Sequence, residues 1–155
     1  MPGKDQILYA NEYGPCACSQ LRRAARKLSM LYDQTLQPAG ITVTQYAVLI
    51  NVARAGEISR TALAAQLGMD RTTLTRNLIP LEKSNLLVPA QSADRRERLI
   101  RLSKSGAGKV RQSFTLWQKA QQTFAEQMGP AKLKQFRSAL EAAEAAAGTI
   151  SESNH

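Results

Sequence analysis

Histidine is nearly absent from this chain of 155 residues. The only histidine is His155, the last residue, so a histidine-based catalytic triad, dyad or zinc site inside the fold is excluded. The sequence also has no glycine-rich phosphate-binding motif, and its acidic residues are scattered among basic ones, with no carboxylate pair suited to acid–base catalysis. We therefore expect a protein that is not an enzyme and that has no cofactor.

Long apolar runs and acidic side chains are scarce as well. No stretch approaches the roughly 20 apolar residues of a membrane span, and the first residues lack the pattern of a signal peptide, so we expect a cytoplasmic protein with no membrane partner. Asp and Glu number 12 against 21 Lys and Arg, which gives a formal net charge of +9 and a pI near 10.0. This excess of positive charge favours a polyanionic partner, and nucleic acid is the natural candidate.

A helix-turn-helix is predicted in the middle of the chain. Ser59 can cap a first helix, in which Leu63 and Leu67 lie on one face, and Gly68 supplies the turn that follows. Asp70 can cap a second helix, whose apolar residues recur at spacings of four and three. These inward residues are Leu74, Leu78 and Leu81.

The outward face of the second helix suits the major groove of DNA, which is wide enough to admit a helix. Its residues are Arg71, Thr72, Thr73, Arg76 and Asn77. No acidic residue follows Asp70 in these turns, so an ordinary helical hairpin with a solvated face is the less favoured alternative. The small side chain of Ala64 lets the two helices cross closely. We expect Pro80 to kink the second helix or to end it early, because proline lacks an N–H donor.

A β-hairpin is predicted directly after these helices. Residues 86–88 and 99–102 suit two strands, and the turn between them begins at Pro89. Four charged residues that could meet DNA lie between the strands: Asp94, Arg95, Arg96 and Arg98. Cationic side chains there suit phosphates or the negative potential of a narrow minor groove, although charge at a loop tip commonly serves solvation alone. Helices and hairpin together predict a winged helix-turn-helix that holds duplex DNA.

The sequence of this wing resembles that of the MarR family of bacterial transcription regulators. The family pattern is Asp-x-Arg followed by an apolar residue, any residue, and Leu-Thr-x-x-Gly. Here it reads Asp94-Arg95-Arg96 and then Ile100-Arg101-Leu102-Ser103-Lys104-Ser105-Gly106. Ser103 replaces the usual threonine and keeps a capping hydroxyl. The resemblance implies that Arg96 enters the minor groove and that Asp94 orients it, and it extends over nearly the whole chain, because the family has helices on both sides of the reading domain.

Helices are also predicted on both sides of the DNA-reading region. Residues 16–37 have an amphipathic pattern, and a second helix capped by Thr44 follows. A long helix covers 104–128, and after a break at 129–130 a last helix continues to a loose tail that begins at Gly148.

The predicted fold is therefore mainly α with a small β-wing. Residues 1–155 form one domain, in which 41–106 are the winged helix-turn-helix region and 16–37 and 107–147 are dimerisation helices that flank it. The resemblance implies a homodimer, since the MarR family dimerises through such helices. Two reading helices about one DNA turn apart would then bind a palindromic operator on double-stranded DNA. The alternative is that the terminal helices complete a monomer core.

Two cysteines, Cys16 and Cys18, stand at the start of the predicted first helix. A thiol there feels the positive end of the helix dipole, and Arg22 and Arg23 follow about one turn later, so the setting favours a reactive thiolate. The chain is also similar to the organic-hydroperoxide-sensing, OhrR-type branch of the family. That similarity implies that Cys18 is the sensing cysteine and that Tyr32 matches a tyrosine near it.

One position departs from that branch, because Val43 stands where it has a second tyrosine. Two alternatives to sensing remain. Both cysteines could be small buried apolar residues, or their thiolates could bind a soft metal such as Cu(I), or arsenite or antimonite.

We predict from these patterns a homodimeric transcription regulator, more specifically a repressor. It would release DNA when a small-molecule effector or cysteine oxidation by an oxidant changes the distance between its reading helices. An architectural DNA-binding protein without an effector, a soft-metal-responsive regulator and a winged-helix protein adaptor are the alternatives.

Overall fold

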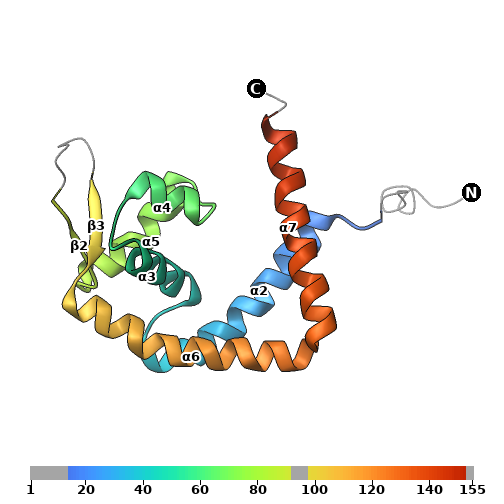
Figure 1. Ribbon diagram of the computed structural model, residues 1–155, viewed down its shortest axis with the longest axis horizontal. Coiled ribbons are helices and arrows are strands. Elements are labelled where there is room, and N and C mark those ends of the chain that lie inside the picture. Colours follow the sequence, from blue (N-terminus) through green and yellow to red (C-terminus); the bar gives the residue numbers. More distant parts are fainter. Residues whose placement is uncertain (1–13, 92–97, 153–155) are drawn as a thin grey trace, which may run out of the picture.

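The computed structural model describes residues 14–91 and 98–152, which fold into a mainly helical molecule with a small antiparallel sheet (Figure 1). In chain order the elements are α2 (Ala17–Leu36), the short 3₁₀ helix η1 (Gln37–Ala39), α3 (Val43–Ala55), β1 (Glu57–Ser59), α4 (Arg60–Gln66), α5 (Arg71–Lys83), β2 (Leu87–Pro89), β3 (Leu99–Leu102), α6 (Lys104–Met128) and α7 (Pro130–Glu152). The prediction of a mainly α fold with a small β-wing is confirmed. Within the described ranges, no helix has the length and apolar character needed to cross a membrane.

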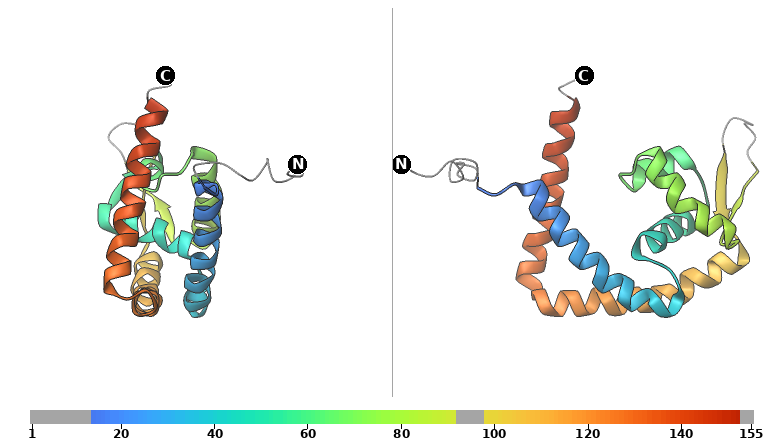
Figure 2. Two further views of the ribbon diagram at one scale, coloured as in Figure 1. Left: turned by 90° about the vertical axis from the view of Figure 1, so that its right-hand side faces the viewer. Right: turned by 180° about the vertical axis from the view of Figure 1, so that it is seen from behind.

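The elements form a U in the view of Figure 1. A head made of α3, α4, α5 and the sheet stands at one end, α6 runs along the base, and α7 rises from the far end of α6. α2 packs along α6. α2 and α7 cross in Figure 1, but Figure 2 shows that they are separated in space. The head and α7 stand at opposite ends of the U (Figure 1).

The hydrophobic core lies mainly in the head. Its fully buried side chains come from both helices and strands and include Leu49, Leu63, Leu78, Leu81 and Leu87. Two contacts fix the head, and η1 directly before it, on α6. Tyr46 of α3 stacks on Trp117 of α6 with ring centroids 5.7 Å apart, and Lys109 Nζ of α6 donates a hydrogen bond to the carbonyl oxygen of Ala39 at 2.7 Å.

The sheet has the strand order β1-β3-β2 and is antiparallel throughout. The hairpin of β2 and β3 confirms the predicted wing, but β1 was not predicted from the sequence. Three residues are too few to show an alternating pattern, and β1 is a strand only because it pairs with β3, with Ile58 opposite Ile100. Both isoleucines are buried in the core of the head.

Side-chain caps fix where the helices of the head begin. As predicted, Ser59, Asp70 and Ser103 cap α4, α5 and α6, and each accepts a hydrogen bond from the backbone N–H three residues on, at 2.7–3.1 Å. The prediction that Thr44 caps α3 is wrong. Thr42 caps α3, because it forms a capping box with the residue three positions on, in which each side chain bonds the other residue's backbone N–H.

Pro80 does not end α5, which continues to Lys83, so of the two predicted effects the early end is wrong, while the kink stays a prediction. A proline inside a helix costs about 3 kcal/mol, because it removes a hydrogen bond and crowds the preceding turn. Burial of Leu78 and Leu81 on either side of Pro80 holds the last turn in place. The Ser84 N–H also donates to the Pro80 carbonyl oxygen at 3.0 Å.

The loose tail predicted from Gly148 onward is also wrong, since α7 passes through Gly148 and continues to Glu152. Alanines fill most of the preceding two turns, and alanine has the highest helix propensity, whereas a glycine inside a helix costs only about 1 kcal/mol. The Thr149 hydroxyl adds a hydrogen bond to the Ala145 carbonyl oxygen at 3.1 Å.

Candidate nucleic-acid interface

α5 is the candidate reading helix, and Asp70 fixes its first turn. Asp70 Oδ1 accepts the Thr73 N–H at 2.7 Å, and Asp70 Oδ2 accepts the Thr73 hydroxyl at 2.8 Å. These hydrogen bonds favour the ionised carboxylate and lower the pKa of Asp70. The cap is therefore formed at neutral pH. Thr73 donates its hydroxyl proton to this cap, so its methyl group and oxygen lone pairs are what it can offer to DNA.

The outward face of α5 lies opposite its three buried leucines. Four of the five predicted residues on this face are exposed: Arg71, Thr72, Thr73 and Arg76. The fifth, Asn77, is half-buried, and its Nδ2 donates a hydrogen bond to the Thr73 carbonyl oxygen at 2.9 Å. The two arginines therefore offer most of the hydrogen-bond donors of this face, while one donor of the Asn77 amide is already used within α5.

Two residues that were not predicted extend the same face. Ile79 is 44% exposed, Lys83 is exposed, and both continue the line of Thr72 and Arg76 at spacings of three and four. The helical spacing alone identifies Ile79, and it identifies Lys83 once the helix is known to continue beyond Pro80. An exposed apolar side chain here can contact the methyl group of thymine, and a lysine can contact a phosphate.

The wing consists of β2 and β3, which pair from Leu87 opposite Leu102 to Pro89 opposite Ile100. Arg98 is exposed immediately before β3. The other predicted wing residues, Asp94, Arg95 and Arg96, lie outside the described residues, and their roles remain predictions.

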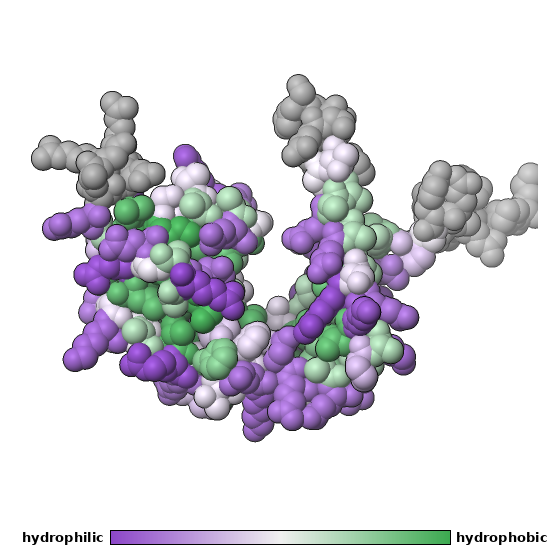
Figure 3. Space-filling view, in the orientation of Figure 1, coloured by the Kyte–Doolittle hydropathy of each residue, from purple (hydrophilic) through white to green (hydrophobic). Residues whose placement is uncertain are grey.

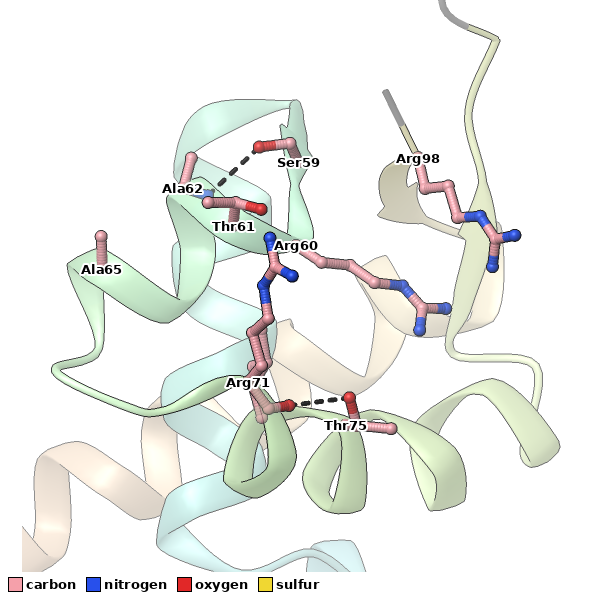
Figure 4. A pocket seen from close by; sticks show the side chains of 9 residues that line it. Ser59, Arg60, Thr61, Ala62, Ala65, Arg71, Thr75 and Arg98 are labelled. Atoms are coloured by element: carbon pink, nitrogen blue, oxygen red, sulfur yellow. Dashed lines mark hydrogen bonds between the residues drawn. The ribbon is translucent and has the colours of Figure 1, made fainter. Parts of the chain in front are cut away.

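A groove of about 670 Å³ lies between α4, α5 and the base of the wing (Figure 4). Three arginines from three elements line it, because Arg60 begins α4, Arg71 begins α5 and Arg98 precedes β3. Arg60 Nη2 also forms an ion pair with Glu82 Oε1 of α5 at 2.5 Å. Arg60 was not predicted as a site residue, since only the folded chain brings it beside the wing.

Both cysteines are exposed thiols near the start of α2. This exposure contradicts the alternative that they are small residues buried in the core. Interactions with the backbone N–H and the hydroxyl of Ser19 lower the pKa of Cys16, which is the residue that precedes the first turn of α2. Cys16 is thus placed to form a thiolate more readily than an ordinary cysteine.

Tyr32 is buried on the same helix, and burial raises the pKa of its hydroxyl. That hydroxyl donates a hydrogen bond to Gln121 Oε1 of α6. Cys18 lies about four turns before Tyr32, or about 21 Å along the axis at 1.5 Å per residue. A single chain therefore does not bring the cysteines and Tyr32 together.

Comparison with known proteins gives matches to one family. Residues 39–97 match the family model described as the MarR family. The structure is similar to that of the transcriptional regulator MosR of M. tuberculosis in complex with DNA, with 34% identity, a TM-score of 0.73 and coverage of 85% of this chain and 98% of that chain. It also has the fold of a MarR variant from E. coli in complex with operator DNA, with 24% identity, a TM-score of 0.74 and coverage of 81% of this chain and 91% of that chain.

Among curated proteins, the chain is similar to YwoH of Bacillus subtilis (strain 168), which is described as an uncharacterized HTH-type transcriptional regulator. The two are 27% identical over 90 residues. That stretch covers 58% of this chain and just under two thirds of YwoH, at 66%.

Proposed function

This chain belongs to the MarR family of winged-helix transcription regulators, and on that premise we propose that it binds a palindromic DNA operator as a homodimer and represses transcription. The observation that carries the proposal is the outward face of α5. It presents Arg71, Thr72 and Arg76 to solvent with no carboxylate among them, beside a wing in which the exposed Arg98 directly precedes the return strand β3. The 34% identical MosR was solved in complex with DNA, which supports the same partner here.

In this proposal each part of the head has its own task on DNA. α5 enters the major groove, where its arginines can donate to guanine edges, and the wing reaches toward the adjacent minor groove. The formal net charge of +9 attracts the phosphate backbone over the whole molecule. Binding should therefore weaken steeply as the salt concentration rises.

The apolar surface outside the head supports a homodimer. No described side chain of α7 is buried, although Leu133, Phe136 and Leu140 lie on one stripe of it. Leu21 of α2 is 48% exposed and Met30 is 61% exposed. Figure 3 shows hydrophobic residues on this side of the molecule, away from the head. A second copy that covers these helices would hold two reading helices at a fixed separation.

Two signals are proposed to release the DNA. Oxidation of the exposed thiols of Cys16 and Cys18 is the first, and the lowered pKa of Cys16 supports it. A small ligand is the second, and a cavity of about 260 Å³ beside Leu28, Tyr32 and Val43, where α2 meets α3, supports it. A soft-metal site is less well supported, because the described residues contain no cluster of three or more His, Cys, Asp or Glu side chains that could hold a metal ion.

The decisive experiment is to map where the purified protein binds on random genomic DNA and on the region upstream of its own gene. A regulator should protect a few palindromic sites, with two half-sites whose centres are about one helical turn apart. Uniform coverage of all DNA would instead indicate an architectural protein. The absence of any salt-dependent DNA binding would favour the adaptor and contradict the proposal.

A further inference from the structure

The arginine groove between α5 and the wing is positively charged, and the ion pair found there among the described residues joins only Arg60, to Glu82. Its lining residues include Arg60, Arg71 and Arg98 and no carboxylate. Arg60 and Arg98 adjoin across the sheet, because Ser59 at the end of β1 pairs with Leu99 at the start of β3. Arg60 directly follows β1 and Arg98 directly precedes β3, and two like charges on neighbouring residues repel each other, so an anion between them would be favourable.

Arg60 also has hydrogen-bonding capacity to spare. A guanidinium carries five N–H donors, and the one acceptor found for them in the described part of the chain is Glu82 Oε1, which bonds Nη2. Arg60 Nε is buried and has no acceptor among the described residues. The side chain of Arg60 is 37% exposed, so solvent and ligands reach part of it. Figure 4 shows the side chain stretched across the groove toward the wing, where Arg98 lies.

The position of the groove indicates what would fill it. The major groove and the minor groove of a duplex are separated by one sugar–phosphate strand. If α5 lies in the major groove and the wing approaches the next minor groove, that strand must pass over the gap between them. The arginine groove occupies this gap. A phosphate diester supplies the oxyanion that a guanidinium binds best, through paired N–H donors.

We propose that Arg60 and Arg98 together bind a phosphate of the DNA strand that separates the two grooves. Glu82 of α5 orients the Arg60 guanidinium through their ion pair. This inference rests on the proposed DNA-binding function and adds Arg60 to the residues that carry it. A contact of this kind sets how α5 is seated in the major groove and does not itself discriminate between base sequences.

The test compares the salt dependence of DNA affinity in four proteins: the wild type, Arg60→Gln, Glu82→Gln and Arg111→Gln. Arg60→Gln should weaken operator and scrambled DNA alike, by roughly tenfold near 0.1 M salt, and should lower the slope of log affinity against log salt by about 1. Glu82→Gln breaks the same ion pair but keeps the arginine, so its slope should not fall. Arg111 is exposed on α6 and does not line the groove, so Arg111→Gln removes the same charge at a site outside it.

Four results would overturn the proposal. If Arg60→Gln and Glu82→Gln lose affinity equally with unchanged slopes, Arg60 supports the fold only. If the wild type binds DNA with a steep salt dependence and Arg60→Gln does the same, the phosphate contact is absent although the DNA-binding function stands. If inorganic phosphate at constant ionic strength stabilises the wild type but not Arg60→Gln, while both bind DNA equally, the groove takes a free anion. A wild type that does not bind DNA refutes the proposed function as well.

Discussion

Arg76 stands near the middle of the exposed face of α5, where a side chain can reach the edges of bases. A bidentate arginine–guanine contact discriminates against other bases by about 1–3 kcal/mol. Arg76→Ala should therefore reduce the preference for operator over scrambled DNA by about that amount, as measured in competition binding. Thr73→Ala should have a smaller effect, because the Thr73 hydroxyl proton is donated to Asp70. Equal losses on every sequence would mean that these residues contact phosphates and do not read bases.

Gly106, at the start of α6, has no room for a side chain. A Cβ added there would lie 2.0 Å from the carbonyl oxygen of Leu86, which also accepts the Ser103 N–H that ties the wing to α6. Gly106→Ala should shift that backbone and destabilise the protein by about 1–3 kcal/mol or more, measured as the free energy of unfolding in urea. Gly148→Ala is the matched control, because a Cβ there meets nothing within 4 Å. This control should stabilise α7 by about 0.5–1 kcal/mol. Equal stability of the two variants would contradict the steric argument.

At the scale of one element, α2 connects the thiols to the head. Asp33 Oδ1, near the end of α2, accepts the Val43 N–H at the start of α3 at 2.7 Å, and Tyr32 bonds Gln121 of α6. A displacement of α2 on oxidation would therefore also move α3, which packs against α5. The distance between two reading helices in a dimer would change with it.

Hydrogen peroxide or an organic hydroperoxide should consequently release the operator, and dithiothreitol should restore binding. Cys16→Ser should abolish the release if the lowered pKa of Cys16 selects the oxidised thiol, whereas Cys18→Ser should abolish it if the OhrR-type resemblance assigns the site correctly. If both variants release labelled DNA at the wild-type rate after oxidation, as measured by fluorescence anisotropy, the thiols do not sense oxidants. The cavity beside Tyr32 would then be the better candidate for the signal.

For the whole molecule, we expect that the functional unit is a dimer of this chain. Leu21 is 48% exposed and the apolar stripe of α7 is only half-buried within one chain, so a second chain can cover both. Light scattering at micromolar concentration should give twice the 17.0 kDa mass of one chain. Leu21→Glu should shift the equilibrium toward monomer and weaken operator binding, because two half-sites are then no longer bound together. A stable species of 17.0 kDa in the wild type would contradict the dimer.

The sequence by itself determined the features that depend on neighbours a few residues apart. Ser59, Asp70 and Ser103 cap helices through a backbone N–H three residues on, and the inward leucines of α5 recur with the period of the helix. Gly68 takes the left-handed conformation, with φ of 60°, that the predicted turn needs. Such short-range hydrogen bonds and spacings can be identified from residue types and intervals alone.

Only the tertiary structure decided the features that depend on distant segments. β1 is a strand because β3, some forty residues on, supplies its hydrogen-bonding partners. Pro80 is tolerated because the leucines around it are buried by other elements. Arg60 lies beside Arg71 and Arg98 because the sheet and two helices meet there, and no interval in the sequence encodes that meeting. Helical spacing fixes which side of a helix a residue occupies, whereas the packing of the whole chain fixes what that side faces.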